Sequence, residues 1–470
     1  MKQIIAVFAA TLVIVLVTFA PLGAADKPAA PELYGLYCWA GNYIQYADDV
    51  QRCGIRWLRV GGWECGEKTT DQAALLAAKN GVNLTPSLDI PGLGHGKTMP
   101  ADQAVAKMRQ VARDNVKRYG PGGSLWKQHP DAKAGPIRYW EIWNEPNIEF
   151  LTPPNDPNGM LRTELYAKLL TAASEEIRKL DPGAVIVAFN TAGGAWDTSR
   201  ALKPDGMFKR LKYIGWRKFI RDVNELAGTK CYDVVGTHPY TKPRGPEAGK
   251  VIEGIAKVRE LAKEQGFDKP IWFTEVGFPI EYPRNQQVRD ERQQACFTVR
   301  LFAVAGAHGV QQVQIMYIKD IIYGPDNTRR SFGFFTAPGK WREQAKATRV
   351  MMRIVPDPRN DSATVLSEKP GGIYAYRFQP PSRPQVVMAW TDGNEPVSYE
   401  LRAGKGSRLG PLSPSSPVLD TTGDSVTIVD ILGNCSTARI SGGKVKLTLT
   451  EAPVYVTPAK LEDVQKALKD

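Results

Sequence analysis

An alternation of short apolar runs with longer amphipathic segments extends over residues 33–345, and it limits the folds open to this chain more than any other feature. Segments such as 102–120 and 163–180 place apolar residues at i, i+3, i+4 and i+7, the spacing of a helix that packs on a sheet. The strand-like runs cover residues 33–39, 55–62, 82–90, 137–145, 184–190, 232–240, 270–278 and 310–318. Strands and helices in this number and order predict an α/β fold, a (β/α)8 or TIM barrel, over residues 30–355.

The pattern changes after residue 355. Short segments that alternate apolar and polar residues follow one another, with Pro and Gly turn signals between them. This predicts a smaller all-β sandwich over residues 360–460. Because it holds no cluster of carboxylates or histidines, we expect it to pack against the barrel. Carbohydrate binding through Tyr374, Tyr376 or Trp390 is the alternative, but these aromatics lie in mid-strand, where a core needs them.

The first 25 residues resemble a secretory signal peptide. Lys2 is followed by a long apolar run and then by the small residues Gly23, Ala24 and Ala25. The apolar run is long enough that an uncleaved membrane anchor is the alternative. The sequence therefore predicts a secreted or periplasmic protein, associated with a membrane only if this segment is retained.

The net charge and the spacing of the cysteines limit the kinds of partner and metal site that we expect. The 61 Lys and Arg against 49 Asp and Glu give a net charge of +12, which fits either a solvated basic surface or attraction to an anionic polymer. No run of five basic residues and no nucleic-acid motif occurs, so nucleic acid is not expected as a partner. The six cysteines lack CxxC and His-paired spacing, so no metal site is predicted; they fit structural bridges or buried small side chains.

Two of the strand-like runs end in a glutamate at a tight turn. The segment "YWEIWNEPN" ends the fourth strand at Glu145, and "IWFTEVGFP" ends the seventh at Glu275. In a (β/α)8 barrel the C-terminal strand ends carry the chemistry, so both side chains would enter the same mouth. Either glutamate alone would be interpreted as a solvated turn residue. Together they predict a two-carboxylate active site.

Paired carboxylates of opposite protonation cleave glycosidic bonds. One protonates the leaving oxygen, and the other, ionised, attacks the anomeric carbon. Arg59, at the end of the second strand, would hold Glu275 ionised, and Tyr240 would orient it. Asn144 would donate to a sugar hydroxyl, and His238 lies on the same strand as Tyr240. Taken singly, Arg59 fits a structural ion pair and His238 a loop residue; their conjunction favours catalysis.

These segments resemble a known group of enzymes. "YWEIWNEPN" and "IWFTEVGFP" are similar to the acid/base and nucleophile signatures of glycoside hydrolase clan A, whose members are retaining glycosidases on (β/α)8 barrels. "RYGPGGSLWKQHP" and the β-rich tail resemble family 39 most, with families 5 and 51 as neighbours. The resemblance covers about residues 34–460. It implies Glu145 as acid/base and Glu275 as nucleophile, with Arg59, Asn144, His238 and Tyr240 in support.

At the position where clan A enzymes often have an aromatic platform for the sugar, this chain differs from the clan. The clan often places a tryptophan at the end of strand eight, whereas this chain has "IMYIKD", with Tyr317 as the nearest aromatic. Trp39, Trp63 and Trp196 fall at or just after strand ends, where they would stack on sugar rings or serve as packing. Trp63 is the preferred platform, because the glycine-rich segment "GGWECGE" is not expected to bury it deeply.

The sequence thus predicts a secreted retaining glycoside hydrolase that acts on a poly- or oligosaccharide by double displacement and needs no cofactor. For that mechanism the two carboxyl groups should lie about 5–5.5 Å apart. Two alternatives stay open: a polysaccharide-binding protein on a barrel scaffold, and a transglycosylase that remodels surface glycan. The sugar and its linkage, exo or endo action and the oligomeric state are not predicted.

Overall fold

The computed structural model describes residues 31–469 except for 133–134, 157–158, 194–211, 242–244, 282–287, 324–327, 360–362 and 406–417. The signal segment predicted over residues 1–25 and the candidate platform Trp196 lie outside the described residues. Within the described part of the chain, no helix combines the length and apolar character needed to cross a membrane.

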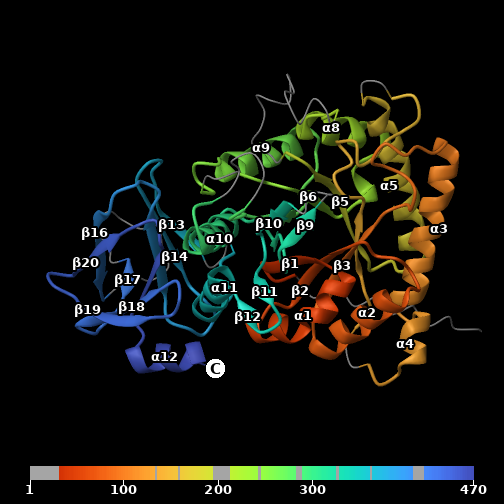
Figure 1. Cartoon of the computed structure of the whole chain (residues 1–470). Coiled ribbons are helices and arrows are strands. Elements are labelled where there is room, and N and C mark those ends of the chain that lie inside the picture. Colours follow the sequence, from red (N-terminus) through yellow and green to blue (C-terminus); the bar gives the residue numbers. More distant parts are fainter. Residues whose placement is uncertain are drawn as a thin grey trace, which may run out of the picture.

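The N-terminal part is a closed barrel of eight parallel strands, with each strand paired to the next and β8 paired to β1 (Figure 1). The prediction of a (β/α)8 barrel is therefore confirmed. Its strands are β1 (Tyr34–Trp39), β2 (Trp57–Gly61), β3 (Asn83–Leu88), β4 (Tyr139–Ile142), β5 (Val185–Thr191), β6 (Val234–Thr237), β7 (Ile271–Val276) and β8 (Gln312–Ile315). Each lies within the apolar run that predicted it, give or take one residue.

Helices cover the outside of the barrel (Figure 1). Their amphipathic sequences bury one face, and α1 and α2 each stop at a glycine, Gly54 or Gly81, whose φ of 90° or 64° other residues avoid. The barrel helices are α1 (Ala40–Cys53), α2 (Lys68–Asn80), α3 (Ala101–Tyr119), α4 (Ser124–Gln128), α5 (Leu161–Leu180), α8 (Trp216–Ala227), η1 (Thr229–Cys231), α9 (Val251–Glu264), α10 (Glu291–Ala307) and α11 (Glu343–Ile354).

The floor of the barrel is filled by aromatic rings. Trp57, Tyr139 and Trp272, all near the N-terminal ends of their strands, form a separate buried cluster with valines of β5 and β6. The Trp57 and Tyr139 ring centroids lie 4.8 Å apart, and those of Tyr139 and Trp272 lie 5.7 Å apart. The barrel is therefore closed at this end, and the opposite, C-terminal end is left for a site.

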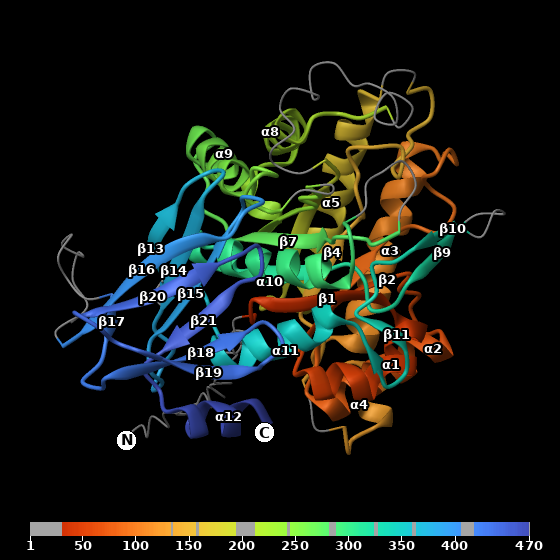
Figure 2. The same ribbon diagram turned by 60° about the vertical axis from the view of Figure 1, so that its left-hand side comes forward.

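Two small hairpins between β8 and α11 were not predicted from the sequence. One pairs β9 (Ile321–Tyr323) with β10 (Thr328–Arg330), and the other pairs β11 (Phe335–Ala337) with β12 (Lys340–Trp341). The first follows β8 in the chain and extends to the edge of the molecule on the side away from the sandwich (Figure 2). It thus extends one wall of the barrel mouth.

The C-terminal part is all-β, as predicted, apart from a final helix. Hydrophobic side chains of a six-stranded and a three-stranded sheet form its core. The six-stranded sheet has the order β13-β14-β15-β21-β18-β19 and the three-stranded sheet the order β17-β16-β20. Their bounds are β13 (Ala363–Glu368), β14 (Ile373–Phe378), β15 (Val386–Thr391), β16 (Val397–Gly404), β17 (Leu419–Asp420), β18 (Ser425–Asp430), β19 (Cys435–Arg439), β20 (Lys444–Leu449) and β21 (Val454–Thr457), followed by α12 (Leu461–Lys469).

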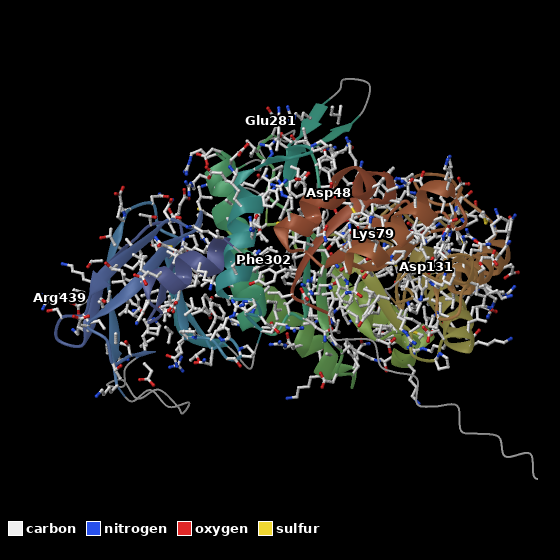
Figure 3. The ribbon with its side chains drawn as sticks, turned by 90° about the horizontal axis from the view of Figure 1, so that it is seen from below. Asp48, Lys79, Asp131, Glu281, Phe302 and Arg439 are labelled. Atoms are coloured by element: carbon white, nitrogen blue, oxygen red, sulfur yellow. The ribbon has the colours of Figure 1, made fainter. Side chains whose placement is uncertain are left out.

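The sandwich packs on α10 and α11, which lie between it and the barrel strands (Figures 1 and 3). Phe302 of α10 is buried between the two parts and contacts Tyr34 of β1 edge to face, with 4.8 Å between ring centroids (Figure 3). The mid-strand aromatics Tyr374, Tyr376 and Trp390 are all buried and belong to the same core. They are therefore packing residues, as expected from their mid-strand positions, and not exposed aromatics that could bind carbohydrate.

A buried ion pair fixes this interface. Arg300 of α10 donates from Nε to Glu247 (2.9 Å), and the indole of Trp390 from β15 donates to the same carboxylate at 2.8 Å. Arg300 and Glu247 are almost fully removed from solvent. Such charges are tolerated only when paired, so the contact ties the position of the sandwich to that of the barrel.

Each of the six cysteines lies within the described residues, and each is a free thiol. Cys38, Cys53, Cys231 and Cys296 are buried, so they serve as small apolar side chains. Cys65 is exposed, but partial burial of its thiol raises the pKa to about 11, which keeps it protonated at neutral pH. The sequence left open whether the cysteines form structural bridges or serve as buried small side chains. The structure has no disulfide among its six cysteines.

We predict that Arg300→Met lowers the free energy of unfolding by about 3–5 kcal/mol, because it leaves the Glu247 carboxylate buried without its cation. Urea unfolding followed by circular dichroism measures this change. The matched control is Glu400→Ala, which breaks the exposed Lys444–Glu400 pair and should leave the free energy of unfolding nearly unchanged. Equal losses in the two variants would show that the interface pair does not stabilise the fold.

Candidate active site

The end of β4 is an irregular turn that aims Glu145 into the barrel mouth. Trp143 and Glu145 have φ values of 66° and 47°, a left-handed backbone that non-glycine residues adopt only under constraint. Asn190, at the end of β5, supplies the constraint: its amide donates to the Trp143 carbonyl at 3.0 Å, and its carbonyl accepts from the Glu145 N–H at 3.2 Å. The Trp143 indole also donates to the Phe150 carbonyl at 3.0 Å. The backbone around Glu145 is thus fixed from several directions.

Arg59 is the centre of the site's hydrogen bonds. Its guanidinium is buried and donates to both oxygens of Glu141, at 2.8 and 2.6 Å. It also donates to Glu275 Oε2 at 2.9 Å and to Asn144 Oδ1 at 2.7 Å. The predicted contact with Glu275 is present. Since Asn144 accepts through its oxygen, its amide nitrogen is the end left to donate to a ligand.

The second oxygen of Glu275 has its own donor. The Tyr240 hydroxyl lies 2.5 Å from Glu275 Oε1 and 2.6 Å from the sulfur of Met316. Arg59 and Tyr240 together hold the two carboxylate oxygens of Glu275 in place. Charge-assisted hydrogen bonds of this kind favour the ionised form of a carboxylate.

Glu145 is in a different environment. Its nearest polar neighbour is His238, whose Nδ1 lies 2.9 Å from Glu145 Oε1. Burial raises the pKa of Glu145 to about 7, although the charges of Arg59 and His95 oppose this rise. Burial also lowers the pKa of His238 to about 4, so the imidazole is neutral near pH 7. A neutral imidazole can donate to ionised Glu145 or accept from its protonated form.

The two carboxylates face one another across the mouth. Glu145, His238 and Glu275 each present a ligand atom, and these atoms all lie within 4.8 Å of one another. Such a cluster has the composition of a metal site. The same atoms, however, already serve protein hydrogen bonds, and a cation would have to displace Arg59 or Tyr240 to gain Glu275. The arrangement is better suited to moving a proton and placing a nucleophile.

Two of the predicted aromatic positions are buried. Trp63 is only 6% exposed: its indole donates to Asn115 of α3 at 2.9 Å, and its ring packs on Tyr119. The expectation that neighbouring glycines would keep it accessible is wrong, because α3 supplies the pocket. Tyr317 follows β8 at the mouth, but its ring is also buried, and its hydroxyl donates to Asn42 at 2.7 Å.

Sequence reasoning missed Glu141 and Tyr37. Glu141 is fully buried in the middle of β4, and the guanidinium of Arg59 lies 4.4 Å from the ring centroid of Tyr37. The signal for Glu141 was a carboxylate inside an apolar strand, which a folded protein tolerates only beside a buried cation. No comparable signal marked Tyr37, since an aromatic residue in a strand is ordinary core material.

Comparisons with known proteins identify solved structures that have a similar fold. No family model and no curated protein sequence matches the chain. Among solved structures, a family 39 glycoside hydrolase from Bacteroides cellulosilyticus WH2 matches with a TM-score of 0.62 at 16% identity, over 91% of this chain and 82% of the other. A family 39 β-xylosidase from Caulobacter crescentus gives 0.53 at 15% identity, over 92% and 98%. A family 51 arabinofuranosidase from Xanthomonas axonopodis pv. citri gives 0.54 at 12%, over 91% and 96%. The chain therefore has the fold of clan A glycoside hydrolases, as its two glutamate motifs predicted.

Proposed function

We propose that this protein is a retaining glycoside hydrolase, with Glu275 as nucleophile and Glu145 as acid/base. The observation that carries the proposal is the opposed environment of two carboxylates whose facing oxygens lie within 4.8 Å. Glu275 is held by Arg59 and Tyr240, whereas burial raises the pKa of Glu145 to about 7. The short spacing favours direct attack over an inverting mechanism, which needs about 6.5–9.5 Å for a water molecule.

In the first step, Glu275 attacks the anomeric carbon while protonated Glu145 gives its proton to the glycosidic oxygen. The carbon–oxygen bond to the leaving group breaks, a glycosyl ester forms on Glu275, and Glu145 becomes a carboxylate. In the second step, that carboxylate takes a proton from water, and the resulting hydroxide attacks the same carbon and displaces Glu275. Both residues return to their starting states.

The supporting residues have matching roles in this scheme. Arg59 and Tyr240 donate to the two carboxylate oxygens of Glu275 and point it at the substrate, and both hydrogen bonds weaken as the ester forms. Neutral His238 donates from Nδ1 to Glu145 after the proton has left, which stabilises the carboxylate between the two steps. The free amide of Asn144 donates to a hydroxyl beside the scissile bond.

We further propose secretion or a periplasmic location, on the basis of the N-terminal segment, and a carbohydrate substrate. Two of the proteins with similar structures are named as a β-xylosidase and an arabinofuranosidase. A first screen should therefore include 4-nitrophenyl β-xyloside, β-glucoside and α-L-arabinofuranoside, together with a polysaccharide panel. Products are compared with and without an added acceptor sugar: transfer to the acceptor would favour a transglycosylase, and binding without turnover would favour a polysaccharide-binding protein.

We predict that Glu275→Ala lowers kcat by ~1000-fold or more on the best substrate of that screen, because no ester can form. Circular dichroism should show an unchanged fold. Glu368→Gln, which alters a glutamate paired with His308 away from the mouth, is the control and should keep full activity. Substantial activity in Glu275→Ala would remove Glu275 from its assigned role.

The stereochemistry of the product gives a separate prediction. Double displacement leaves the configuration at the anomeric carbon unchanged, so proton NMR should show the first-formed sugar with the configuration of the substrate. Inversion of that configuration would rule out the glycosyl-enzyme.

The pH dependence should identify Glu145. The first step needs its protonated form, so kcat/KM should fall about tenfold per pH unit above pH about 7. A Glu145→Gln variant, assayed with a 2,4-dinitrophenyl glycoside whose leaving group needs no proton, should show no such alkaline limb. If the limb persisted in the variant, another group would be the acid.

A further inference from the structure

Trp39, at the end of β1, presents its ring to solvent in a way that the other described tryptophans do not. Its side chain is 55% exposed, whereas no other described tryptophan is among the exposed large hydrophobic residues. Single exposed apolar side chains are common and need no explanation by themselves. Trp39 differs because the protein holds its ring in a fixed place beside the site.

Gly61, the last residue of β2, and Gly62, which follows it, make room for side chains of β1. A Cβ on Gly61 would lie 2.5 Å from the Tyr37 hydroxyl, so only glycine fits there. At Gly62, where φ is 59°, a Cβ would lie 3.5 Å from the indole carbons of Trp39. The indole therefore lies along the Gly62 backbone. The pair that was expected to expose Trp63 instead supports Trp39.

Tyr37 connects Trp39 to the proposed catalytic centre. Burial raises the pKa of the Tyr37 hydroxyl, and the neighbouring Trp39 side chain opposes that rise, so the two side chains lie close together. The Tyr37 ring in turn lies 4.4 Å from the Arg59 guanidinium, which donates to Glu275 at 2.9 Å. Trp39 is thus connected to the proposed nucleophile through Tyr37 and Arg59, and it lies on the β1–β2 side of the mouth, away from Glu145, which follows β4.

The position at the end of β8 does not offer a comparable surface. The Tyr317 ring is buried, meets Tyr37 edge to face with 5.1 Å between centroids, and uses its hydroxyl to contact Asn42. Its faces are therefore occupied by protein. The neighbouring strand, β1, carries the accessible ring instead.

We propose that Trp39 is a stacking platform for a neutral pyranose ring of the glycan chain, one sugar beyond the ring that Glu275 attacks. This assignment of a glycone subsite rests on the proposed function. A flat, rigid indole suits sugars such as β-glucosyl or β-xylosyl units, whose equatorial hydroxyls leave the C–H bonds to line the faces of the ring. The Gly62 backbone lies along the indole and supports it, so the sugar meets a preformed surface.

Affinity electrophoresis tests this binding without any need for turnover. Native gels contain xyloglucan, xylan or hydroxyethylcellulose, and every protein carries Glu275→Gln to prevent cleavage. We expect at least one polysaccharide to retard the parent, Trp39→Ala to weaken that binding about tenfold, and Trp39→Phe to retain most of it. Leu226→Ala, which removes a similarly exposed apolar side chain on α8 (59% exposed), is the control and should match the parent. No retardation in any gel, or equal retardation of Trp39→Ala and the parent, overturns the proposal.

Kinetics separate a platform from a residue that only positions Arg59. With Glu275 intact, Trp39→Ala should raise KM about tenfold on xylo- or cello-oligosaccharides and leave kcat within threefold on the matching 4-nitrophenyl monoglycoside. Equal loss of kcat on both substrates would assign Trp39 to the support of Tyr37 and Arg59, and the platform would be wrong. If neither substrate is turned over while the gels still show Trp39-dependent binding, the proposed hydrolase fails and the platform stands.

Discussion

The buried guanidinium of Arg59 is the interaction on which the site depends. Taking that charge out of water is unfavourable unless its donors are all used, and Glu141 alone accepts two of them. Two further donors reach Glu275 on β7 and Asn144 beyond β4. One side chain of β2 therefore holds the end of β4 and the end of β7 together, and these strand ends cannot move apart without leaving a buried charge unpaired.

The same interaction explains why the two facing glutamates differ. Arg59 is shared between Glu141 and Glu275, while Glu145 has an uncharged histidine as its near neighbour. Burial therefore acts on Glu145 with little compensation and raises its pKa to about 7. Removal of the Arg59 charge would disturb both groups at once, whereas a change at His238 would remove the hydrogen-bond partner of Glu145. The difference in environment between Glu145 and Glu275, on which their proposed roles as acid and nucleophile rest, thus follows from the position of one cation.

Much of this could be predicted from sequence because it is repeated or local. The strand and helix periods recur along the barrel, and a glutamate beside proline or glycine at a strand end is visible in a few letters. Trp63 could not be assigned in this way. Its pocket is built by Asn115 and Tyr119, which come from a helix about one barrel unit later. Local glycine content says nothing about such a neighbour, and the same glycines proved to accommodate Tyr37 and Trp39.

The net charge of the chain does not predict the charge of the sugar that the site would accept, because net charge carries no information about position. The net charge of +12 is a sum over the whole chain, whereas the barrel mouth holds several carboxylates, among them Glu141, Glu145 and Glu275. Asp89, just after β3, adds another: burial raises its pKa, with the nearby Arg59 charge and the Asn144 backbone opposing the rise. An anionic sugar beside Glu275 would therefore compete for a guanidinium that two carboxylates already share. The charges of the site favour a neutral ring there, whatever the outer surface attracts.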